Sequence, residues 1–267
     1  RALPVGAWVG FVIFGVVVVT GVAAPLIAPH NPTQIDLANA LRPPRGFAGA
    51  NPAYLLGTDQ LGRDVLSRMI YGARVSIMIA TSAVAIAALI GVVVGVIAGY
   101  YGGRVADVLM RLADVQLAFP AVILAIIVAA TLGGGMRNLV IVLGVIGWTT
   151  FARVARGSTL SERKKQYVEA ATSLGCSDFR IMFRHILPNL ASPLLVVAAF
   201  TVAQMVLWEA GLSFLGLGVP PPQASWGSML ADGRSQVATA WWLATLPGIA
   251  IAITILGINL IGEWLRE

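Results

Sequence analysis

Long apolar runs separated by shorter polar stretches dominate the pattern of the chain. Five windows contain no Asp, Glu, Lys or Arg: 8–28, 75–99, 115–136, 190–208 and 237–262. A membrane core of about 30 Å requires roughly 20 apolar residues in a helix, so each window is long enough to span a bilayer. A sixth window, 138–152, is shorter, but the flanking Arg137 and Arg153 can extend to the interface. The pattern predicts six transmembrane helices.

The period and composition of these runs indicate the fold class. The runs are continuous in Val, Ile, Leu and Ala and lack the apolar and polar alternation of a membrane β-barrel. With 58% hydrophobic residues, 11% charged residues and a mean hydropathy of +0.84, the chain is predicted to be an all-α integral membrane protein. We divide it into the N-terminus and first helix (1–29), a polar, Pro-rich segment (30–74) and a helical core (75–267) with a charged loop (153–190).

The distribution of Lys and Arg predicts the orientation in the membrane. The 153–184 stretch holds seven of these residues, whereas the 218–236 loop holds only Arg234. Short loops rich in Lys and Arg stay in the cytoplasm, so we expect the charged loop and both termini there, in a plasma-membrane protein. The 30–74 segment has five Arg, but it is too long for charge to decide its placement, and we expect it outside. The net charge of +6 is explained by topology and lipid headgroups, without nucleic acid.

The charged loop has the pattern of a helix, an elbow and a second helix. Residues from Ser161 onward suit a helix, which Gly175 ends in the left-handed conformation that favours glycine. The second helix begins at Ser177 or Asp178, and Pro188 is expected to stop it before the next span. It presents two sets of residues: apolar Phe179, Met182, Phe183 and Ile186, and basic Arg180 and Arg184. Such a segment is either an interfacial helix on lipid headgroups or a docking surface for a partner.

The spacing in this loop resembles the EAA loop of ATP-binding cassette importer permeases. Glu169-Ala170-Ala171 is followed after three residues by Gly175, and nine more residues lead to a hydrophobic pair and Leu187-Pro188. His185 departs from the family pattern, in which Ile is usual. In that family the loop seats in a groove on a cytoplasmic ATPase subunit. The resemblance therefore implies a set of coupling residues: Glu169, Ala170, Ala171, Gly175, Asp178, Arg180, Arg184, Leu187 and Pro188.

Two further stretches resemble the C-type subunit of the dipeptide, oligopeptide and nickel permeases. They are "LLGTDQLGRDVLSRMIYGARVS" (55–76) and "EAGLSFLGLGVPPPQASWGSML" (209–230). The ending "NLIGEWLRE" departs from the family's usual one at Glu263 and Trp264. The resemblance implies a type I importer permease fold, with six transmembrane helices and the coupling loop between helices four and five. It also implies three kinds of partner besides the lipid bilayer: a second permease subunit, ATPase subunits that hold ATP and Mg, and an extracytoplasmic binding protein.

The sequence contains no recognisable catalytic motif. A phosphate-binding loop requires Gly-Lys-Ser or Gly-Lys-Thr, but the only lysines, Lys164 and Lys165, follow Arg and Lys. Cys176 is the only cysteine and there are two histidines, which leaves little for a thiolate metal site or for acid–base chemistry. We therefore expect no enzyme activity, resident cofactor or metal in this chain.

Charged residues close to the spans offer an alternative mechanism. Asp107, Arg111 and Asp114 share one helical face and can pair with each other. Glu209 lies between apolar flanks and needs a partner or water, and it either lines a translocation path or fixes the link to the last span. In a proton-coupled secondary transporter, Asp114, Glu209 and Glu263 would form the relay. Such a transporter would have no use for an EAA loop.

The resemblance implies that this chain is a permease subunit forming half of an importer pore for short peptides. Nickel chelates are the alternative cargo within the same family, because specificity there resides largely in the binding protein. A scaffold without transport activity would explain the docking loop but not the Gly- and Pro-broken windows at 115–136 and 237–262. Trp226, Trp241 and Trp242 are either interfacial anchors or cargo contacts.

Overall fold

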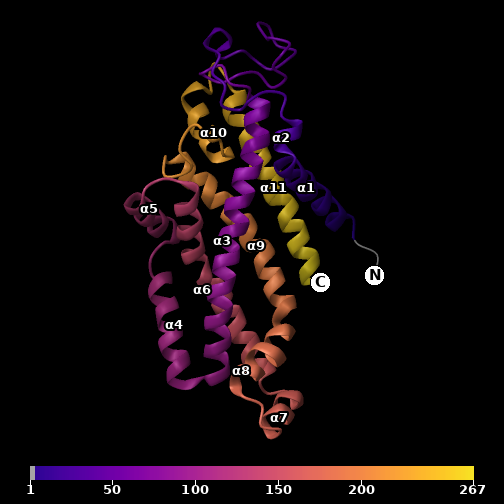
Figure 1. Ribbon diagram of the computed structural model, residues 1–267, viewed down its shortest axis with the longest axis vertical. Helices are drawn as coiled ribbons and strands as arrows, with labels where there is room; N and C mark the ends of the chain where they lie inside the picture. The colour runs from indigo at the N-terminus through magenta and orange to yellow at the C-terminus, as the bar shows by residue number, and fades with distance from the viewer. Residues whose placement is uncertain (1–3) are drawn as a thin grey trace.

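The computed structural model describes residues 4–267, whose secondary structure is helical apart from one isolated bridge between Thr58 and Asp64 (Figure 1). Five helices are long and apolar enough to cross a membrane: α1 (Val5–Val22), α3 (Val65–Tyr101), α6 (Met136–Glu162), α9 (Ala191–Phe214, with the turns before it) and α11 (Trp242–Arg266). A bent pair, α4 (Gly103–Leu117) and α5 (Ala121–Leu132), brings the number to six if it is one span. The predicted all-α membrane fold is confirmed.

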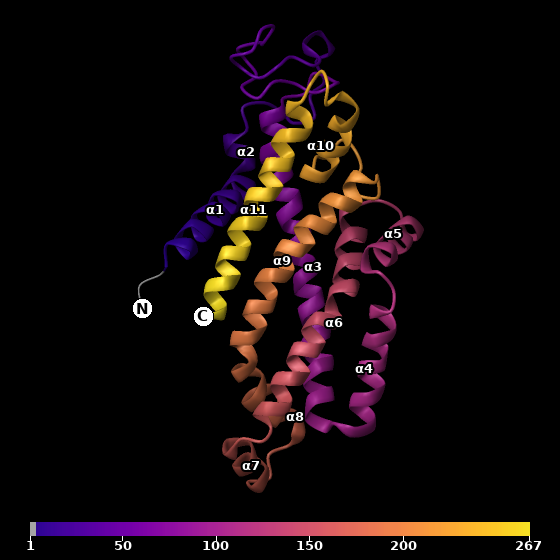
Figure 2. The same ribbon diagram turned by 180° about the vertical axis from the view of Figure 1, so that it is seen from behind.

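Close packing of α3 against α6 forms the centre of the bundle (Figures 1 and 2). Gly91, Gly95 and Gly99 recur every four residues on α3 and lie against α6. A β-carbon at Gly91 would collide with the carbonyl oxygen of Trp148, and one at Gly95 with that of Ala152. Small residues permit this approach, and close contact is what holds helices together in lipid, where no hydrophobic force drives their association.

Helix α3 begins at Val65, inside the polar segment, rather than at Val75 where the charge-free window starts. The Asp64 carboxylate caps it by accepting a hydrogen bond from the Ser67 N–H at 2.9 Å. The added turns contain Arg68, which is buried despite its charge. A window defined by the absence of charge therefore misses the start of this helix, because Arg68 is neutralised by tertiary contacts.

The window 115–136, predicted to be a Gly- and Pro-broken span, is broken at Pro120 and is shared between two helices. Helix α4 ends at Leu117, Pro120 caps α5, and the two helices are bent by 85°. Proline lacks an N–H and its ring excludes the preceding helical turn, so a break at this position is expected. Much of α4 lies before the apolar window and carries the charges Arg104, Asp107 and Arg111. Figure 1 shows α4 and α5 together at one side of the bundle.

The remaining short elements gather at the two ends of the long axis (Figure 1). One end, here called the α7 end, holds α7 (Gln166–Ser173), α8 (Asp178–Arg180), a π-helical turn (Ile181–Ile186) and a 3₁₀ turn (Leu187–Leu190). The other, here called the α10 end, holds α2 (Ala24–Ile27), the irregular segment 28–64 with a 3₁₀ turn (Leu37–Asn39), α10 (Trp226–Gly233) and a further 3₁₀ turn (Arg234–Gln236). Candidate functional groups occur at both ends.

Candidate functional site

A glycine elbow shapes the loop at the α7 end. Gly175 has φ +77°, and its N–H donates to the Thr172 carbonyl at 2.9 Å. The Cys176 N–H reaches back to the Ala171 carbonyl at 3.0 Å, which completes the hydrogen-bond pattern that ends helices through a left-handed glycine. The predicted elbow is therefore present. The predicted unbroken helix from Ser161 is wrong, because α6 ends at Glu162 and α7 begins only at Gln166.

An apolar cluster anchors this elbow to the long helices. Val168 and Ala171 of α7 pack with Ile181, Met182, Ile186 and Leu190 of the following turns, and with Val96 of α3 and Ala155 of α6. Ile181, Ile186 and Leu190 are completely buried. Burying a side chain of this size contributes roughly 1.5–3 kcal/mol, so the three together hold the loop firmly against the bundle.

Polar contacts reinforce the same anchor. The Tyr100 hydroxyl of α3 donates to the Asp178 carboxylate at 2.8 Å, and Arg163 Nη1 donates to the Tyr100 carbonyl at 2.7 Å. The Tyr167 hydroxyl donates to Glu162 at 2.8 Å, and burial together with this carboxylate raises the pKa of Tyr167 to about 12. The phenol therefore remains a donor at neutral pH. These bonds connect the loop to both α3 and α6.

The second helix of the loop differs from its prediction in two ways. Phe179 is 70% exposed, whereas Ile181 is buried in its place. A π-helical turn over 181–186 has more residues per turn than an α-helix, and it therefore shifts which side chains face the bundle. Pro188 does not stop the helix, because it lies in the first turn of a 3₁₀ segment, where its missing N–H needs no partner. The helical path continues directly into α9.

The outer surface of the elbow mixes apolar and charged side chains. Leu174 is 84% exposed and lies beside the elbow glycine, and Phe179 is exposed on the next helix. Of the nine implied coupling residues, Leu187 is partly buried and Ala171 is buried. The other seven are exposed: Glu169, Ala170, Gly175, Asp178, Arg180, Arg184 and Pro188. A solvent-facing tip on a rigidly packed base has the form of a docking element.

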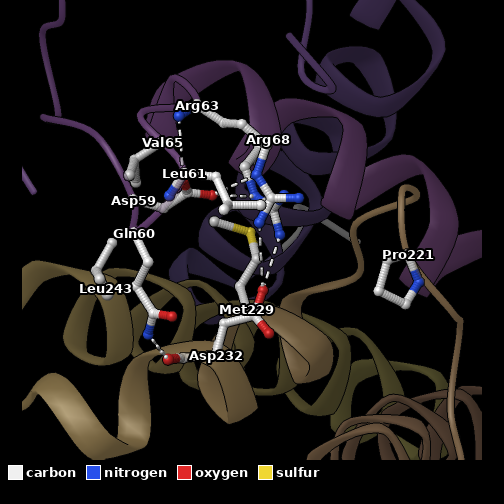
Figure 3. A pocket seen from close by; sticks show the side chains of 10 residues that line it. All are labelled: Asp59, Gln60, Leu61, Arg63, Val65, Arg68, Pro221, Met229, Asp232 and Leu243. Atoms are coloured by element: carbon white, nitrogen blue, oxygen red, sulfur yellow. Dashed lines mark hydrogen bonds and ion pairs between the residues drawn. The ribbon is translucent and has the colours of Figure 1, made fainter. Parts of the chain in front are cut away.

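The α10 end contains a charge cluster that the sequence analysis did not identify (Figure 3). Arg63 Nε donates to Asp59 Oδ2 at 2.7 Å, and Arg68 Nε lies 3.4 Å from the same oxygen. Arg68 Nη2 also donates to Asp232 of α10 at 3.1 Å, and Gln60 binds the Asp232 carbonyl oxygen at 2.7 Å. The four charges line a cavity of about 220 Å³. They fasten the irregular segment and the start of α3 to α10.

Part of this charge cluster could have been predicted from the spacing of its residues in the sequence. Asp59 and Arg63 stand four residues apart, and Arg68 follows in the first turn of α3, so two of the four ion pairs are local in the chain. The third partner, Asp232, is 164 residues away from Arg68, and no spacing rule points to it. The resemblance over 55–76 covers these residues without assigning them a role.

Glu209 lies at the same end, completely buried within α9. The Ser76 hydroxyl of α3 donates to one of its carboxylate oxygens at 2.8 Å, and the Ser213 hydroxyl donates to the other at 2.7 Å. The Trp226 N–H of α10 in turn donates to the Ser76 hydroxyl at 3.3 Å. Glu209 therefore has hydroxyl partners on α3 and α9, and Ser76 connects it to α10, in the link to the last span.

Asp114 pairs across helices rather than within α4. Its carboxylate is 2.7 Å from Arg153 of α6, and both side chains are more than half exposed. The predicted mutual pairing with Asp107 and Arg111 is not formed among residues 4–267, because the polar face of α4 is turned towards α6 and its arginines. Asp107, Arg111, Asp114 and Arg156 instead line an open hollow of about 650 Å³.

Comparisons with known proteins cover most of this chain. The profile of the family "Binding-protein-dependent transport system inner membrane component" matches residues 91–267, and that of "N-terminal TM domain of oligopeptide transport permease C" matches residues 5–44. The inward-facing MetNI methionine ABC transporter has a chain of the same fold, with a TM-score of 0.60 at 16% identity, covering 74% of this chain and 94% of that one.

Curated relatives align over almost all of the sequence. The di/tripeptide transport system permease protein DppC of Pseudomonas aeruginosa is 39% identical over 98% of this chain and 86% of its own length. The oligopeptide transport system permease protein OppC of Bacillus subtilis is 37% identical over 98% and 84%. A putative peptide transport system permease protein of Brucella suis is 43% identical over 97% and 85%. The chain therefore belongs to the inner-membrane components of binding-protein-dependent transport systems, as a C-type permease subunit of an ATP-binding cassette importer.

Proposed function

We propose that this permease subunit forms one half of a pore for the uptake of short peptides. The relatives are named for dipeptides, tripeptides and oligopeptides, which favours peptides over nickel chelates as cargo. The α7 end faces the cytoplasm with both termini, and the segment 30–74 lies outside the plasma membrane, as the distribution of Lys and Arg supports. A second permease subunit completes the pore, and a binding protein delivers cargo from outside.

The observation that carries the proposal is the rigid elbow with its exposed tip. Leu174 and Phe179 offer apolar contact area and Glu169, Arg180 and Arg184 surround them with charge, as in a docking surface with an apolar centre and a polar rim. We place the cytoplasmic ATPase subunits, with their ATP and Mg, on this surface. The tip is also held to α3 and α6 by buried side chains and continues into α9.

This construction supports a lever mechanism. When the ATPase subunits close, the elbow moves with them, because its base packs as tightly as a protein interior. The movement passes to α3 through Val96 and Tyr100 and to α9 through the continuous helix from Asp178. Rotation of these helices switches the pore between its two openings. Because ATP hydrolysis by the partner subunits supplies the energy, transport needs no proton relay through Asp114 and Glu209.

Co-purification tests the docking role. The tagged chain is extracted from native membranes in mild detergent, and ATPase subunits and ATPase activity are measured in the eluate. The Leu174→Ser/Phe179→Ser double variant is expected to lose the ATPase subunits, because the apolar centre of the surface is removed. Leu37→Ser, at a leucine of the α10 end that is 67% exposed against 84% for Leu174, is the control and is expected to retain them. Retention by the double variant, or purification of the chain alone with proton-driven uptake, would contradict the proposal.

A further inference from the structure

A groove with a mainly apolar lining and a few polar side chains lies between α6, α9 and α11, away from both ends. It has a volume of about 450 Å³, within the range of roughly 300–1,000 Å³ that is usual for small-molecule sites. The lining includes Thr150 of α6, Phe200, Thr201 and Gln204 of α9, and Asn259 of α11. None of the candidate residues discussed above belongs to it. The groove is therefore separate from the coupling surface and from the charge cluster.

Gln204 is an exposed polar residue near the middle of the membrane core. It lies ten residues before the end of α9 at Phe214, or about 15 Å at 1.5 Å per residue, close to the middle of a membrane core of about 30 Å. Its side chain is exposed, Asn259 is partly exposed, and neither amide has a hydrogen-bond partner among residues 4–267. A primary amide facing lipid without a partner is unfavourable, so this face must meet water, cargo or protein.

The chemistry of the lining indicates which of water, cargo or protein meets this face. Gln204 and Asn259 each offer donors and an acceptor, and the Thr150 hydroxyl offers both, whereas Thr201 already bonds the Val197 carbonyl at 2.7 Å. No charged residue lines the groove, and its apolar walls are formed by Val197, Phe200, Ala203, Leu207 and Ile255. Uncharged donors and acceptors match the N–H and C=O groups of a peptide bond, which every peptide carries regardless of its side chains.

We propose that this groove is the membrane-depth section of the translocation path and binds the backbone amides of cargo peptides through Gln204, Asn259 and Thr150. The assignment deepens the proposed function and rests on it for the identity of the cargo. A path that recognises the backbone alone accepts many side chains, which suits a pore that receives cargo already selected outside the membrane. The hollow lined by Asp107, Arg111, Asp114 and Arg156 differs, because its charges would distinguish acidic from basic cargo.

Thiol accessibility tests the location. Gln204→Cys and Val12→Cys are compared in the assembled complex in membranes, each in a Cys176→Ser background. Val12 is a matched control, since it is exposed on α1 ten residues before Val22 and hence at a similar depth, but without polar neighbours of this kind. A water-soluble methanethiosulfonate is expected to modify Gln204→Cys at least about tenfold faster, because the reagent is excluded from lipid. Equal rates for the two variants would overturn the inference.

Uptake measurements test the ligand. Gln204→Leu is expected to lower uptake of tri-alanine about tenfold, with the same factor for tri-lysine and tri-glutamate, because a hydrogen bond to the backbone is lost in each case. Val12→Leu is expected to leave uptake unchanged. Undiminished uptake by Gln204→Leu, or a loss confined to charged peptides, would contradict backbone recognition. If the wild-type complex imports no tripeptide, the proposed cargo fails, while thiol accessibility still decides whether the groove is an aqueous path.

Discussion

The two ends of this permease use charge and apolar contact in opposite ways. At the α10 end the charges are inside: the side chains of Arg68, Asp59 and Arg63 are only 3%, 7% and 10% exposed. At the α7 end the base of the elbow is apolar and buried, while Arg180 and Arg184 face outward. The same residue types thus connect segments of the chain at one end and remain available to a partner at the other.

The comparison separates a structural from a functional use of charge. Buried charges are tolerated only where partners compensate for the loss of hydration, so a change in the α10 cluster should act on stability first. Exposed charges contribute little to stability, so a change at the α7 tip should act on association first. Four variants test this distinction, beginning with the largest expected effect.

Arg68→Met should be the most destabilising. It removes one of the two arginines that Asp59 and Asp232 share, so Arg63 alone must neutralise both carboxylates. Complete loss of a buried partner costs about 3–5 kcal/mol, and this partial loss is expected to come close to the lower figure. The expected result is a large drop in the thermal unfolding midpoint of the detergent-purified complex. Arg180→Met, at an exposed site, is the control and should leave the midpoint unchanged. Equal midpoints for the two variants would remove the basis of the comparison.

Glu209→Leu should have the next largest effect. The substitution leaves the hydroxyls of Ser76 and Ser213 without their acceptor in a buried site, at about 1–3 kcal/mol. Glu209→Gln keeps a polar group of the same shape and should restore most of the stability. The measurement is the unfolding midpoint, with uptake as a second readout. Full stability with abolished uptake in Glu209→Gln would instead point to a transport role for the carboxylate.

Gly175→Val should disturb coupling more than stability. A β-branched residue at φ +77° is strained by about 1–2 kcal/mol, which should distort the elbow while the membrane helices still insert. Uptake and ATPase stimulation by the binding protein should fall together, and the amount of membrane-inserted chain should remain. Gly157→Ala, a helical glycine with open space around it, is the matched control. Normal uptake by Gly175→Val would exclude the elbow from the lever.

Asp114→Asn should have the smallest effect on stability. The pair with Arg153 is exposed on both sides, and such pairs contribute about 0–1 kcal/mol. The unfolding midpoint is expected to shift little and uptake to continue. Loss of uptake with unchanged stability would show that the hollow at α4 participates in transport. It would also support a functional role for the Asp114 carboxylate.

Local patterns explain which predictions succeeded. The apolar windows located the spanning helices, because the membrane core stabilises a sufficiently long apolar helix wherever it occurs in the chain. The elbow at Gly175 followed from the preference of glycine for the left-handed conformation, which depends on one residue and its neighbours. The spacing from Glu169 to Pro188 led to the correct family.

Tertiary packing decided the rest. The 85° angle between α4 and α5, the continuation of the helix through Pro188 and the exposure of Phe179 depend on how helices are accommodated against their neighbours. Asp232, which pairs with Arg68, and Ser76, which bonds Glu209, lie more than 130 residues away from these partners, so sequence spacing contains no information about either contact. The sequence by itself determined which segments enter the membrane and where the loop turns, because those preferences are local. Only the tertiary structure decided which charges are buried together and which face a partner, because burial depends on the whole assembly of helices.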